Sequence, residues 1–100
     1  GPSSLGNVLG IQGLFGGAGI QNDGVSQATI RVEVFTVDLV PVLGAAVTLT
    51  TTLGTLGAAA LTTDASGTAT TTLTSGAIVG TAYITATVDN VSATTAVPII

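Results

Sequence analysis

The chain has 100 residues, enough for one domain with a single hydrophobic core. Only 6% of the residues are charged, the formal net charge is −4, and Arg31 is the only basic residue, which excludes a nucleic-acid-binding surface and a basic membrane-surface helix. Cysteine, histidine and lysine are absent, so the usual nucleophilic dyads and thiolate metal sites cannot form, and we expect neither enzyme activity nor a cofactor.

The N-terminal segment, residues 1–21, mixes apolar side chains with many glycines. Because glycine weakens helices and strands alike, we expect only short strands around 8–12 and 19–21, joined by an irregular bend. The segment suits a first edge strand on its own sandwich, which we favour, and it also suits an apolar strand that docks on a neighbouring subunit. Its candidates for an assembly interface are Leu5, Val8, Leu9, Ile11, Leu14 and Phe15.

A turn at Asn22-Asp23-Gly24 precedes a long alternating stretch, residues 25–37. The period of two predicts a half-buried strand, with Arg31 and Glu33 together on its outer face. The residues predicted to face inward are Ala28, Ile30, Val32 and Val34.

The connection after this strand, residues 38–45, is unusually apolar for a loop that water would reach. Its apolar side chains are therefore further candidates for an assembly interface: Leu39, Val40, Val42 and Leu43.

Short strands with turn signals fill the rest of the chain. We expect strands at 46–52, 58–63, 68–74, 81–88 and 91–97, with Pro98 as the limit of the last. With the first edge strand and the strand at 25–37, this makes about seven strands and no helix. The pattern predicts an all-β fold, an immunoglobulin-like antiparallel β-sandwich over residues 22–100 preceded by the glycine-rich segment 1–21.

Three acidic residues, Asp38, Asp64 and Asp89, lie in alternate connections, which share one end of such a sandwich. Three carboxylates at one end are candidate calcium ligands, but aspartate is also simply a good turn residue, and no calcium-loop pattern is present. We favour the turn interpretation and predict no metal. Asn90-Val91-Ser92 is a candidate glycosylation sequon at the last hairpin, with Asn90 as the acceptor.

Three ordered blocks of sequence carry a family resemblance. They comprise Asn22-Asp23-Gly24 with Ala28-Thr29-Ile30, then Pro41-Val42 with Val47-Thr48-Leu49, and finally Thr62 to Ala69 with Gly80-Thr81-Ala82. In this order and spacing, residues 22–97 resemble a bacterial immunoglobulin-like domain of the invasin/intimin type (group 1). The apolar segments 5–20 and 39–43 depart from the pattern, which is normally polar after Asp38.

The resemblance implies a structural repeat unit or subunit of an extracellular surface adhesin stalk or filament. Its expected partners are neighbouring immunoglobulin-like domains, either in tandem, with Val97 to Ile100 running into the next copy, or as separate polymerising subunits. The alternative function is a cell-adhesion binding module that recognises a host receptor or glycan through the end bearing Asp38, Asp64 and Asp89. Because no apolar run approaches about 18 residues, we expect no membrane insertion.

Overall fold

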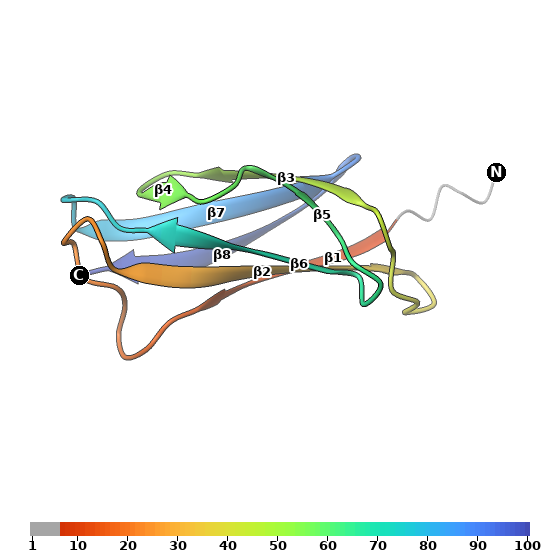
Figure 1. The fold of residues 1–100 in the computed structure, drawn as a ribbon, viewed down its shortest axis with the longest axis horizontal. Coiled ribbons are helices and arrows are strands. Elements are labelled where there is room, and N and C mark those ends of the chain that lie inside the picture. Colours follow the sequence, from red (N-terminus) through yellow and green to blue (C-terminus); the bar gives the residue numbers. More distant parts are fainter. Residues whose placement is uncertain (1–6) are drawn as a thin grey trace.

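The computed structural model describes residues 7–100 as two four-stranded antiparallel sheets that pack face to face (Figure 1). The first sheet has the order β1-β2-β6-β4 and the second the order β5-β3-β7-β8. The strands are β1 (Asn7–Leu14), β2 (Gln27–Thr36), β3 (Ala46–Thr51), β4 (Thr55–Leu56), β5 (Ala60–Thr62), β6 (Thr68–Thr74), β7 (Gly80–Val88) and β8 (Val91–Ile99). This architecture confirms the predicted immunoglobulin-like sandwich. Leu5, an interface candidate, lies outside the described residues.

The core lies between the sheets and is supplied by the inward face of each strand. Alternate residues of β2 and β7 are almost fully buried, as their period of two predicts. Burial of each large aliphatic side chain stabilises the fold by about 1.5–3 kcal/mol. The largest fully buried side chains are Ile30, Val32, Val34, Val47, Leu73, Ile84, Val97 and Ile99.

Several strands differ from the sequence prediction. Despite its glycines, β1 runs over eight residues rather than the short stretch 8–12, and residues 19–21 hold only the isolated bridge of Ile20 instead of a strand. A short eighth strand, β4, pairs with the end of β6 through Thr55 and Leu56; two residues are too few to show alternation. The last strand does not stop before Pro98 but continues to Ile99. Proline is tolerated there because β8 is the last strand of its sheet, with β7 as its one neighbouring strand, and the only backbone that joins its outer side is the isolated bridge of Ile20 at Ile99 among the described residues.

The apolar connection after β2 is not an irregular loop over its whole length. Residues 40–42 fold back antiparallel on the end of β2, with an isolated bridge between Phe35 and Pro41. The Thr36 amide donates to the Val40 carbonyl at 2.8 Å, and the Val42 amide donates to the Val34 carbonyl at 3.0 Å. The segment thus extends the ladder beyond Glu33, where the pairing of β2 with β6 ends.

The N-terminal part of the chain contributes to both sheets. β1 pairs with β2 over its whole length, and the chain then crosses to the second sheet, where Ile20 forms a parallel bridge with Ile99. Ile20 donates to the Pro98 carbonyl at 2.9 Å and accepts from the Ile100 amide at 2.8 Å. Gly19 permits this approach, since a Cβ there would lie 2.5 Å from the Pro98 oxygen.

The molecule is a rod with extents of 48 × 21 × 21 Å, and the strands follow its long axis (Figure 1). We call the end where β1 begins the N-terminal end and the end where β8 finishes the C-terminal end. Among residues 7–100 there is no helix long and apolar enough to cross a membrane.

Candidate functional site

The C-terminal end is built from three segments that hydrogen bonds tie together: 20–26, 75–79 and the last residues of the chain. The Asn22 side-chain amide donates to the Ala77 carbonyl at 3.0 Å, and the Asn22 backbone amide donates to the Ile100 carbonyl at 3.0 Å. The buried Ser75 hydroxyl accepts from the Gly24 amide at 3.2 Å. These bonds join distant parts of the sequence into one surface.

Asp23 organises the turn at the centre of this surface. Its Oδ1 accepts from the amides of Val25 and Ser26, and its Oδ2 accepts from the Ser26 hydroxyl at 2.8 Å. Because these bonds favour the ionised carboxylate, with the bond from the Val25 amide the largest cause, the pKa of Asp23 falls from 3.8 to about 2. The carboxylate acts as a structural acceptor here.

Apolar side chains project from this hydrogen-bonded end into solvent. Val25, Ile78 and Val79 are 63–73% exposed, although the loops that carry them are tied to one another. We call these three residues the Ile78 patch. Sequence reasoning missed it, although the signal was the one that marked residues 38–45: an apolar pair, Ile78-Val79, in a connection between strands.

The N-terminal end contains the connection 37–45, which is hydrogen-bonded to the buried residue Thr63. Thr63 is 2% exposed; its hydroxyl donates to the Val42 carbonyl at 2.6 Å and accepts from the Ala45 amide at 2.8 Å. Its backbone pairs as well, because the Gly44 amide donates to the Thr63 carbonyl at 2.9 Å. Thr63 thus holds the second half of the connection, residues 42–45, while the ladder with β2 holds the first half.

Four large apolar side chains of this connection face solvent: Val37, Leu39, Val40 and Leu43. We call them the Leu39 patch. Leu39 is 71% exposed and has a φ of 64°, a left-handed conformation that is disfavoured by roughly 1–2 kcal/mol for a residue with a Cβ. The turn is closed by a 2.9 Å bond from the Leu39 amide to the Thr36 carbonyl. Because Leu39 is both strained and exposed, its side chain is a candidate for contact with another molecule.

The sequence-derived interface candidates divide into two groups in this structure. One group packs against the molecule's own core and is partly buried: Leu9, Ile11, Phe15 and Val42. The other group is exposed: Val8 and Leu14 on β1, and Leu39, Val40 and Leu43 at the N-terminal end. The second group presents the larger part of its side chains to solvent.

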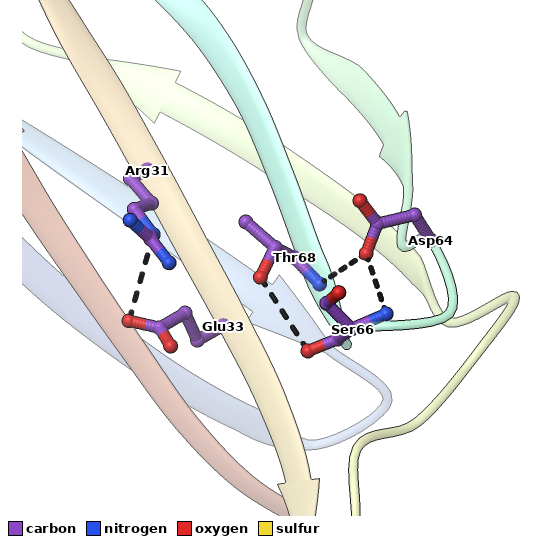
Figure 2. A network of polar contacts seen from close by, with 5 residues as sticks. All are labelled: Arg31, Glu33, Asp64, Ser66 and Thr68. Carbon is purple, nitrogen blue, oxygen red and sulfur yellow. Dashed lines mark hydrogen bonds and ion pairs between the residues drawn. The ribbon is translucent and has the colours of Figure 1, made fainter.

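The connections that carry Asp38, Asp64 and Asp89 leave the strands toward the N-terminal end, but the three carboxylates do not form a ligand group. Within residues 7–100, no cluster of three or more such side chains is placed to hold a metal ion. The Oδ1 of Asp64 accepts from the amides of Ser66 and Thr68 at 2.9 and 3.0 Å, and thereby shapes its own turn (Figure 2). Asn90 is exposed in the two-residue turn between β7 and β8.

The single basic side chain lies on the side of the rod, away from both apolar patches. Arg31 faces outward from β2, with its Nε 3.7 Å from Oε1 of Glu33 (Figure 2). Both side chains are well exposed, so the pair stabilises the fold little.

Comparison with known proteins places the chain in a family. The family model described as invasin, domain 3, matches residues 16–100. The chain belongs to this family. It is an adhesin domain with the immunoglobulin-like fold. No curated protein sequence matches it at a significant level.

Solved structures of related proteins agree with this assignment. The D0-D1 domain of intimin is 29% identical with a TM-score of 0.82, covering 96% of this chain and 49% of that one. A C-terminal intimin fragment, solved in complex with the intimin-binding domain of the translocated intimin receptor (Tir), is 32% identical with a TM-score of 0.72; 89% of this chain and 30% of that one are covered. The Yersinia pseudotuberculosis adhesin InvE is 29% identical with a TM-score of 0.75, over 90% and 26%. This chain therefore spans at most about half the length of these structures.

Proposed function

We propose that this chain is a structural unit of an extracellular adhesin at the cell surface, a stiff spacer arranged end to end with other immunoglobulin-like domains. The observation that carries the proposal is the shape of this chain, which matches the family model of invasin domain 3. The chain forms a rod in which β1 begins at one end and β8 finishes at the other. Strands that run along the axis and enclose one continuous core between the two sheets give stiffness in that direction. The relatives of about twice this length leave room for neighbouring domains.

A second candidate function is recognition of a receptor or glycan at the N-terminal end, through the connections of Asp38, Asp64 and Asp89. It is supported by the intimin fragment solved with a receptor domain. It is weakened by Asp64, whose carboxylate is occupied by its own turn.

A bead-adhesion assay separates the two functions. The purified chain, coupled to beads, would be applied to cultured host cells and to arrayed glycans, with a variant carrying Asp38→Asn and Asp89→Asn as the comparison. A spacer is expected to show no saturable binding in either form. Saturable binding that the double substitution abolishes would overturn the spacer proposal in favour of the binding module.

A further inference from the structure

The sequence contains one aspartate that is followed directly by a glycine, Asp23-Gly24 at the C-terminal end of the rod. In a flexible chain such a pair is chemically unstable, because the amide nitrogen of a glycine, which has no Cβ beside it, can approach and attack the aspartate side chain. We propose that Asp23 is the site at which this chain forms isoaspartate, and that Ser75 suppresses the reaction while the protein stays folded. The proposal goes beyond the spacer function and does not depend on it.

The reaction needs only the chain itself and water. The Gly24 nitrogen loses its proton and attacks Cγ of the protonated Asp23 carboxyl group; a C–N bond forms, a C–O bond breaks, and one water leaves. The resulting succinimide ring then takes up one water at either of its carbonyl groups. Opening at the former side-chain carbonyl restores aspartate. Opening at the main-chain carbonyl leaves a backbone that runs through the side-chain carbons, which is isoaspartate.

In the folded protein, one hydroxyl group contacts both of the reacting groups. The Gly24 amide donates to Oγ of Ser75 at 3.2 Å, and the same hydroxyl donates to Oδ1 of Asp23 at 3.4 Å. Ser75 is itself held in place, because it is 5% exposed and its amide donates to the Ser26 carbonyl at 2.9 Å. The proton that the reaction must remove from Gly24 is therefore engaged in a hydrogen bond, and the nitrogen is tied to a buried group.

The carboxyl group of Asp23 is also held in an unreactive form. Oδ1 accepts from the amides of Val25 and Ser26 at 3.0 and 2.7 Å, and Oδ2 accepts from the Ser26 hydroxyl. With the bond from the Val25 amide as the largest cause, the pKa of this carboxyl group falls to about 2, so it stays ionised. An ionised carboxylate resists attack, since its oxygen cannot leave as water until it is protonated.

Opening of the C-terminal end removes these protections together. Ser75 lies 51 positions from Gly24 and 52 from Asp23, so its contacts exist only while two distant loops stay joined. Once the loops separate, the Gly24 amide and the Asp23 side chain are free to reach each other. Isoaspartate should therefore accumulate in proportion to the time that this end of the rod spends open.

The product cannot return to the original turn. Isoaspartate adds a methylene group to the backbone and leaves its free carboxylate directly on Cα. The acceptor that the amides of Val25 and Ser26 share in the native turn is then lost. The modification would be a permanent chemical record of opening, and it would weaken the same end that had opened.

A comparison of the folded and unfolded parent chain tests the proposal. The chain would be incubated for weeks at one mildly acidic pH, in buffer and in guanidinium chloride. Isoaspartate would be quantified by enzymatic methylation and located by peptide mass spectrometry. We expect it to form at Asp23 at least about tenfold faster in the unfolded chain, which is the rate equivalent of one or two lost hydrogen bonds. Asp64, which is followed by Ala65, is the internal control and should react more slowly in the unfolded chain, because a Cβ hinders the attack.

Variants of buried hydroxyls at the two ends isolate the role of Ser75. In the folded state, Ser75→Ala should accelerate isoaspartate formation at Asp23 by roughly two- to tenfold, whereas in guanidinium chloride it should match the parent. Ser75→Thr keeps the hydroxyl and should restore most of the protection. Thr63→Val is the matched control, because it removes a buried hydroxyl at the opposite end. Its rate at Asp23 should stay within about twofold of that of the parent, as for distant sites with no shared partner.

Equal rates in the folded and unfolded parent would overturn the proposal, and this comparison decides even if Ser75→Ala does not fold. Faster formation at Asp64 than at Asp23 in the unfolded chain would overturn the choice of site. A folded Ser75→Ala variant that reacts like the parent, or a Thr63→Val variant that reacts as fast as Ser75→Ala, would remove the protective role of Ser75. The spacer function is tested separately, by binding to cells and glycans.

Discussion

The hydroxyl of Thr63 donates a 2.6 Å hydrogen bond to the carbonyl of Val42, and this contact joins the end of β5 to the apolar connection at the N-terminal end of the rod. The same oxygen accepts from the Ala45 amide. A single buried hydroxyl thus satisfies two backbone groups that the fold would otherwise leave unpaired.

Thr63→Val should destabilise the protein although it conserves volume. The substitution leaves the Val42 carbonyl and the Ala45 amide without partners, which costs about 1–3 kcal/mol. For a domain of this size, each kcal/mol lowers the melting temperature by roughly 4–8 °C. Thr62→Val, at the exposed neighbouring position, is the control and should stay within about 0.5 kcal/mol of the parent. Equal melting temperatures for the two variants would contradict the anchoring role of Thr63.

Asp23 should make the stability of the protein sensitive to acid. Its pKa is lowered to about 2 in the folded state, whereas the ordinary value is 3.8. A depressed pKa contributes stability that is complete above about pH 4 and is lost as the pH falls toward 2, because the unfolded chain takes up the proton first. Urea unfolding at several pH values should show this loss.

Two variants isolate the contribution of Asp23. In Asp23→Asn the part of the acid dependence that belongs to this carboxylate is absent. Ser26→Ala, which removes the donor to Oδ2, should weaken the dependence without abolishing it. An Asp23→Asn variant whose stability falls between pH 4 and pH 2 as steeply as that of the parent would rule out this assignment.

Gly67 and Gly24 form a matched pair for testing close packing at a turn. Both have left-handed backbones, with φ of 74° and 78°. A Cβ on Gly67 would lie 2.5 Å from the Val34 carbonyl oxygen, whereas nothing lies within 4 Å of a Cβ on Gly24. Gly24→Ala should cost roughly 1–2 kcal/mol from backbone strain alone. Gly67→Ala should cost about 1–3 kcal/mol more, because the backbone must shift. Chemical denaturation measures both, and equal losses would show that the contact at Gly67 relaxes freely.

Leu39→Asn should stabilise the isolated chain while removing the tip of the Leu39 patch. Asparagine tolerates the left-handed region, so relief of strain at φ 64° raises the free energy of unfolding by up to about 1 kcal/mol. A loss of stability would indicate that Leu39 packs within its own molecule.

The strands were predictable where alternation is long. In β2 and β7 each inward position is apolar and each is buried, so the local pattern and the packed core agree. The pattern could not reveal β4, because its two residues are too few to show alternation and are defined as a strand only by their pairing with β6. Nor could it show that β8 continues past Pro98, because that depends on β8 lying at an edge.

The candidate site was less accessible to sequence reasoning. The apolar composition of 38–45 pointed to an unusual surface, yet it could not separate the core-packed Val42 from the exposed Leu43. That division is set by Thr63, which lies 21 positions beyond Val42. Alternating connections predicted which end the aspartates approach but not whether their carboxylates meet. The carboxylate of Asp64, for example, is oriented by hydrogen bonds within its own turn.

The parallel pairing of Ile20 with Ile99 determines how the rod responds to tension. A pull between the two ends acts along β1 in one direction and along β8 in the other. Under such a pull, residues 20–22 would slide along the end of β8. The hydrogen bonds that join residues 20 and 22 to residues 98 and 100 lie perpendicular to that movement and share the force. When two paired strands are pulled apart from one end, their hydrogen bonds break one after another. The bonds between residues 20–22 and 98–100 are loaded at the same time, so they must break together. A cell held to a surface under flow would pull on such a domain in its most resistant direction.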